Sequence, residues 1–133
     1  MHMKKNGKFF DFIENIGTIV NYESFIAQVP KGISNVNDLL SAFFDILNLP
    51  GYFGFNWNAL YDCLCDFHWI DQHKITIIHE DLPALSQEDL TIYLEILQDA
   101  VNDWKPGESH QLTVVFPKSY QEAVENTLKN KCQ

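Results

Sequence analysis

The chain has 133 residues, which suits one compact domain with a single hydrophobic core. Eighteen acidic residues against nine basic ones give a formal net charge of −9 at pH 7, and this balance argues against direct nucleic-acid binding, because phosphate contacts need clustered Lys or Arg. Although 46% of the residues are hydrophobic, no apolar run is long enough to span a membrane and the polar start MHMKKNGK is unlike a secretory signal, so we expect a single cytoplasmic domain over residues 1–133.

The first part of the chain contains one predicted strand and one predicted helix. Residues 24–29 (SFIAQV) are rich in β-branched and aromatic side chains, as strands are. The stretch GTIVNY at residues 17–22 is a candidate for an additional strand at the edge of the sheet. Residues 34–49 place apolar side chains at helical spacing behind a cap-forming serine and asparagine, and Pro50 ends this helix.

Later segments continue the alternation of helices and strands. Gly51 and Gly54 mark a loop in which the backbone can bend tightly. Residues 74–80 (KITIIHE) and 111–116 (QLTVVF) are nearly continuous apolar runs, which indicate strands covered on both faces. The predicted helices of this part cover residues 56–67, 86–104 and 119–130.

Long crossovers separate the three predicted strands. Such connections favour parallel pairing, because antiparallel neighbours can be joined by short turns. The sequence therefore predicts an α/β fold with a small three-stranded parallel sheet packed against helices, and with residues 17–22 as a possible extra N-terminal edge strand.

Helical spacing divides residues 56–67 into two faces. The stripe predicted to be buried consists of Trp57, Leu60, Leu64 and Phe67. A second stripe consists of Asn58, Tyr61, Asp62 and Cys65. This second stripe continues the aromatic loop GYFGF, and a carboxylate among rings that exclude water is suited to binding a cation. The alternative, a solvated helix face with an ordinary exposed acid, is left open by spacing alone.

The segment LPGYFGFNWNALYDCL at residues 49–64 resembles the signature of the barstar family, small intracellular inhibitors of guanyl-preferring, barnase-like ribonucleases. Nearly every position of the family pattern is present. The wider resemblance covers about residues 24–117 and has the same order of strands and helices as predicted above. Residues 1–23 and 118–133 lie outside it.

The resemblance implies a protein that occludes the active site of a basic, secreted or toxic ribonuclease in a one-to-one complex. Asp62 matches the carboxylate that takes the place of the RNA phosphate, Tyr52 the aromatic that packs on the catalytic His, and Tyr61 a ring position that is commonly Trp. An acid on the following helix should align near Asp99. Together with the outward stripe of residues 56–67, the resemblance gives as candidate partner-binding residues Tyr52, Phe53, Gly54, Asn56, Asn58, Tyr61, Asp62, Cys65 and Asp99.

Two positions depart from the family pattern. Asn58 stands where many relatives carry a second acid, and Phe55 replaces a residue that is commonly polar or acidic. Both changes weaken the negative potential near Asp62. They therefore suggest either a partner with a different active-site rim or weaker binding to that partner.

Two other functions compete with ribonuclease inhibition. The first is a barstar-like immunity or interaction module for a toxin of different chemistry. The second is a metal- or thiol-dependent enzyme, but the spacing of His68, His73 and His79 matches no zinc motif, and acidic surroundings disfavour a reactive Cys65 thiolate. We therefore expect no enzymatic activity, no metal and no cofactor, and a protein that is monomeric when free.

Overall fold

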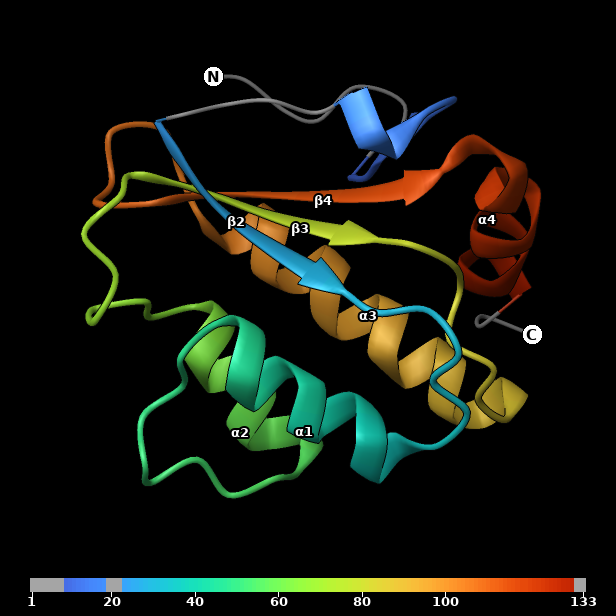
Figure 1. Cartoon of the computed structure of the whole chain (residues 1–133), viewed down its shortest axis with the longest axis horizontal. Helices are drawn as coiled ribbons and strands as arrows, with labels where there is room; N and C mark the ends of the chain where they lie inside the picture. The colour runs from blue at the N-terminus through green and yellow to red at the C-terminus, as the bar shows by residue number, and fades with distance from the viewer. Residues whose placement is uncertain (1–8, 19–22, 131–133) are drawn as a thin grey trace.

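The computed structural model describes residues 9–18 and 23–130 and contains one parallel sheet in the strand order β1-β4-β3-β2 (Figure 1). Its strands are β1 (Asp11–Ile13), β2 (Ser24–Val29), β3 (Lys74–His79) and β4 (Gln111–Pro117). The helices are α1 (Val36–Ile46), α2 (Trp57–Leu64), α3 (Gln87–Asp103) and α4 (Gln121–Asn130), with short 3₁₀ helices η2 (Ile16–Thr18) and η3 (Lys118–Tyr120). The predicted strand and helix order is confirmed from β2 to α4.

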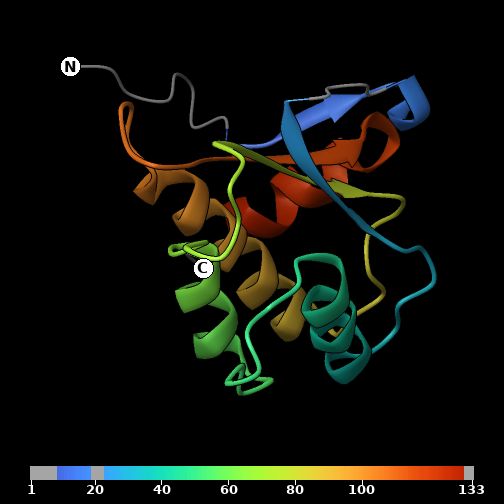
Figure 2. The ribbon, with the colours of Figure 1, turned by 60° about the vertical axis from the view of Figure 1, so that its left-hand side comes forward.

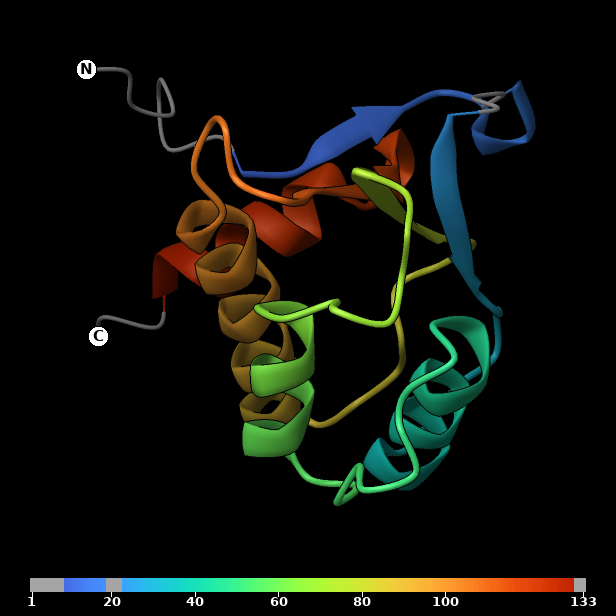
Figure 3. The same ribbon diagram turned by 90° about the vertical axis from the view of Figure 1, so that its left-hand side faces the viewer.

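The helices lie on one side of the sheet (Figure 3). Ile75 and Ile77 of β3 point to this side and are fully buried, while Thr76 between them is only partly buried. Thr113 of β4, the register partner of Thr76, is also partly buried. The expectation that β3 and β4 are covered on both faces was therefore wrong for the middle of these strands.

The sheet has four strands instead of three, and its extra strand is not where the sequence placed it. The edge strand β1 pairs with β4 at residues 11–13, whereas Gly17 begins no strand and lies in η2. Residues 19–22 of the predicted strand lie outside the described residues. Aromatic packing explains the position of β1, since Phe12 stacks on Phe116 of β4 at 6.2 Å and Phe10 meets the same ring edge-on at 5.4 Å.

Three helices begin at side chains that cap their N-termini. Asn35, Asn56 and Ser86 accept hydrogen bonds from the backbone N–H groups three residues later, at the starts of α1, α2 and α3. Among the described residues, no helix is long and apolar enough to cross a membrane.

His79 is a buried polar residue at the end of β3. Its Nδ1 lies 3.1 Å from the Val115 carbonyl oxygen and its Nε2 lies 2.5 Å from the Tyr93 hydroxyl. A carbonyl can only accept, so Nδ1 carries the proton and the tyrosine hydroxyl donates to Nε2. The ring also stacks on Phe116 at 3.9 Å. Burial lowers the pKa of His79 to about 3, and the imidazole is therefore neutral in the folded protein at physiological pH.

Candidate functional site

The loop that joins α1 to α2 lies at the end of the molecule farthest from the sheet (Figures 2 and 3). Asn56 organises this loop, because its Oδ1 accepts from the Ala59 N–H at 2.8 Å and its Nδ2 donates to the Gly54 carbonyl at 3.3 Å. A Cβ at position 54 would lie 3.1 Å from Asn56 Nδ2, so glycine gives the amide its space. One side chain thus caps α2 and fixes the loop before it.

Replacing Asn56 with alanine should lower the free energy of unfolding by about 1 kcal/mol, because the first turn of α2 loses its cap. Asn56→Asp keeps an oxygen acceptor for the Ala59 N–H and should stay close to the wild type. Urea denaturation followed by circular dichroism measures both variants. Equal losses for alanine and aspartate would assign the loss to the Nδ2 bond to Gly54, which both variants lack, instead of to the cap.

The aromatic residues of the loop divide into exposed and buried ones. Tyr52 is 71% exposed and Phe55 is 46% exposed, but Phe53 is only 5% exposed and belongs to the core. The Phe53 ring lies 4.8 Å from that of Phe55 and 6.3 Å from that of Phe44. Phe53 is therefore placed to support the Phe55 ring from below, and its burial does not fit the direct partner contact that the resemblance implied.

Helix α2 presents the predicted polar stripe outwards. Asn58 and Asp62 are exposed, and Tyr61 and Cys65 are partly buried. Within residues 9–18 and 23–130, no hydrogen bond or ion pair engages the Asp62 carboxylate. The buried stripe is confirmed for Leu60, Leu64 and Phe67, which are fully buried, whereas Trp57 is half-buried with its ring 6.2 Å from that of Tyr93.

Asp103, the last residue of α3, ties α2 to α3. The Tyr61 hydroxyl donates to Asp103 Oδ2, and the Cys65 thiol lies 3.7 Å from the same oxygen. Next to it, the Trp104 indole N–H donates to the Leu64 carbonyl at the end of α2 at 2.9 Å. These contacts hold the outward face of α2 in one position relative to α3.

The sequence pointed to Asp99 and missed Asp103. The two residues are four apart on α3, about one helical turn, so they share a face of that helix and both are exposed. The signal that could have identified Asp103 is this i, i+4 pair of acids on the helix that follows the signature. Besides burial, Asp103 and Asp62 both contribute to the raised pKa of Cys65, so these two carboxylates from two packed helices lie in one region of the molecule.

The thiols near this region stay protonated at neutral pH. Burial raises the pKa of Cys65 to about 11, and the Asp103 carboxylate contributes to the rise. Burial also raises the pKa of Cys63, with further contributions from Asp66 and Asp62. The hydrogen bond to Asp103 raises the pKa of the Tyr61 hydroxyl. A thiolate nucleophile is therefore disfavoured here.

The charge of this part of the chain is entirely negative. Residues 32–73 contain five aspartates and no lysine or arginine. A surface of this kind favours encounter with a basic partner.

The histidines singled out in the sequence lie apart from one another and have separate partners. His68 is exposed and pairs with Asp66 at 2.8 Å, His73 Nδ1 lies 3.0 Å from the Ser109 carbonyl oxygen, and His79 is buried as described above. In the part of the chain that the structure describes, no three His, Cys, Asp or Glu residues are grouped so that they could hold a metal ion.

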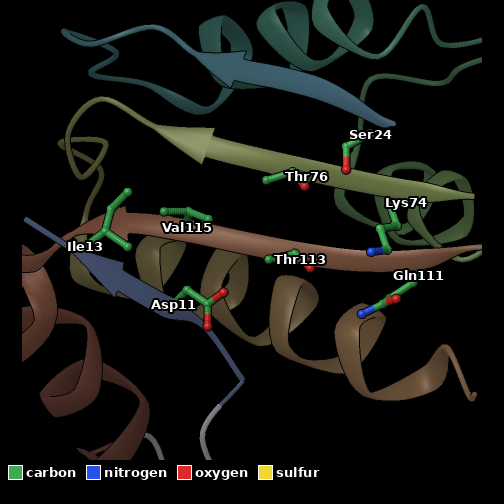
Figure 4. Close-up of a pocket in the computed structure, with 8 residues that line it drawn as sticks. All are labelled: Asp11, Ile13, Ser24, Lys74, Thr76, Gln111, Thr113 and Val115. Carbon is green, nitrogen blue, oxygen red and sulfur yellow. The ribbon is translucent and has the colours of Figure 1, made fainter. Parts of the chain in front are cut away.

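A hollow of about 300 Å³ lies on the sheet face opposite the helices (Figure 4). It is lined by Asp11, Ile13, Ser24, Lys74, Thr76, Gln111, Thr113 and Val115. No cysteine or histidine is among these residues, and the hollow is separated from the α2 surface by the sheet. The surface of α2 and its loop is therefore the stronger candidate for the functional site.

Comparison with known protein families identifies a match over most of the chain. The model of the family described as Barstar (barnase inhibitor) matches residues 26–117, which include the whole loop and α2. The chain belongs to the barstar family. No curated protein and no solved structure matched it. The match covers residues 26–117, so β1 and α4 lie outside it, and they pack against β4 and α3 respectively.

Proposed function

We propose that this protein inhibits a barnase-type ribonuclease by covering its active site with α2 and residues 51–56. In this complex the Asp62 carboxylate takes the position of an RNA phosphate among the cationic side chains of the enzyme. The proposal follows from membership of the barstar family, whose description names barnase inhibitors. The observation that carries it is the exposed Asp62 carboxylate, which no other described residue engages and which follows Tyr61 on the outward stripe of α2.

Rigidity supports this role. A phosphate mimic has to be held at a fixed position, since ordering a mobile segment on binding costs affinity. Asn56 fixes the start of α2, and Asp103 and Trp104 fix its outer face and its end. The carboxylate of Asp62 therefore projects from a helix that is already held in place.

The proposal includes several further properties. The complex is one-to-one, the free inhibitor is monomeric, and it acts in the cytoplasm of the producing cell, which it protects from a nuclease that is toxic or destined for secretion. The five aspartates and missing basic residues of segment 32–73 support a basic enzyme as partner. Inhibition is stoichiometric and requires no cofactor.

Titration of a barnase-type ribonuclease with this protein tests the proposal. Cleavage of a guanine-containing RNA should fall linearly and end at one equivalent of inhibitor, as tight binding at an active site requires. A ribonuclease of an unrelated structural class serves as the negative control. If equimolar protein leaves every barnase-type enzyme tested fully active, the proposal is wrong and an interaction module for a toxin of other chemistry becomes the better interpretation.

A further inference from the structure

Phe55 is an exposed aromatic residue in a backbone conformation that aromatic residues rarely adopt. Its φ is 52°, in the left-handed region, where Cβ crowds the backbone and where glycine, asparagine and aspartate are preferred. Its ring is nonetheless 46% exposed. A residue of this type is expected at such a position only when its side chain has a use there.

Neighbouring residues hold this conformation in place. Asn56 follows directly and is fixed by its two hydrogen bonds, to the Ala59 N–H and the Gly54 carbonyl. One side of the Phe55 ring packs on Phe44, at 5.3 Å, and on Phe53, at 4.8 Å. The other side remains open to solvent. The loop thus presents the Phe55 ring as a supported apolar knob immediately before the start of α2.

The charge near this knob differs from that expected for a purely electrostatic binding face. Position 58, on the first turn of α2, carries a neutral amide, and position 55 carries an apolar ring. The acids Asp62, Asp99 and Asp103 lie further along α2 and at the end of α3. The surface therefore has an apolar end at the loop and an acidic end along the helices.

We infer that Phe55 is a specificity-determining residue, which enters an apolar pocket on the rim of the partner ribonuclease, beside the cationic centre that receives Asp62. This inference rests on the proposed function and names the kind of enzyme that is inhibited: one whose active-site rim is apolar on the side facing the loop. An enzyme with basic residues at that rim would leave a buried cation without a partner opposite Phe55 and would bind more weakly.

The test compares Phe55→Asn, Phe55→Leu and Phe55→Glu with the wild type on purified barnase-type ribonucleases whose rims are apolar or basic. Asparagine accepts the left-handed conformation but lacks the ring, so Phe55→Asn should lower affinity for the apolar-rim enzymes by about tenfold or more, the loss expected when a large apolar side chain is no longer buried. Phe55→Leu should keep most of the affinity. Phe55→Glu should shift the preference toward the basic-rim enzymes.

Two controls separate this inference from the function on which it rests. Urea midpoints establish that each variant is folded, and Asp62→Asn reports on the phosphate-mimicking contact independently. If Phe55→Asn binds every enzyme as the wild type does while Asp62→Asn fails to bind, the inhibitor function stands and the role of Phe55 is wrong. If the wild type inhibits none of the enzymes, both are wrong.

Discussion

Replacing Asp62 with asparagine should weaken binding to a barnase-type ribonuclease by about a hundredfold or more, while the fold and its stability stay unchanged. The amide keeps the size and shape of the side chain but removes the negative charge that the cationic cleft would bind. Leaving desolvated cations without their counter-charge costs about 2–5 kcal/mol at protein interfaces, a range that measurements on the barnase–barstar complex helped to set. Asp62 is exposed and no described residue bonds to its carboxylate, so the folded protein loses no contact of its own.

Glu122→Gln is the matched control for this experiment. Glu122 is an exposed acid on α4, outside the segment that matches the barstar family, and its replacement changes the net charge by the same amount. Isothermal titration calorimetry or surface plasmon resonance at fixed salt measures both variants. A purely long-range charge effect would lower the affinity of both variants alike, and that result would contradict a specific role for Asp62.

Lowering the pH from 6.5 to 4.5 should reduce the free energy of unfolding by about 2 kcal/mol through His79 alone. The unfolded chain takes up a proton on this histidine near pH 6.5, whereas in the folded protein its pKa is lowered to about 3. The stability that the neutral His79 contributes is therefore fully present above pH 6.5, and it is lost progressively as the pH falls toward 3. Urea denaturation at several pH values gives the slope.

The variant that isolates this effect is His79→Gln, which can still donate to the Val115 carbonyl and accept from Tyr93 but does not titrate. It is expected to be less stable than the wild type at pH 7 and to lose less stability on acidification. His68→Gln, at an exposed histidine, controls for the general effect of removing an imidazole. Parallel pH slopes for wild type and His79→Gln would show that the buried ring has no part in acid unfolding.

The parts of the fold that sequence predicted well are those with a strong local signal. The strand at Ser24–Val29 has the predicted limits, and the helix predicted to begin at residue 56 has Asn56 as its cap. The burial of Leu60 and Leu64 followed directly from helical spacing. The outward stripe of α2 was predictable for the same reason, because one helix determines the relative directions of its side chains.

The parts that sequence missed depend on contacts between distant segments. Strand β1 has only three residues and is positioned by Phe12 and Phe10 packing on Phe116, more than a hundred residues later. The burial of Phe53 and the bond from Tyr61 to Asp103 likewise require the packing of α1 and α3 around α2. No local pattern distinguishes Asp103 from Asp99, since both are acids on the same exposed face.

The bond between Tyr61 and Asp103 also bears on binding kinetics. Helices α2 and α3 are joined at this point, so the surface that we propose for the nuclease has no internal rearrangement to complete before contact. Association would then be limited by diffusion and orientation of the two proteins, accelerated by opposite charge and slowed by salt. Substitutions within the contact would lengthen or shorten the lifetime of the complex far more than they alter the rate of its formation.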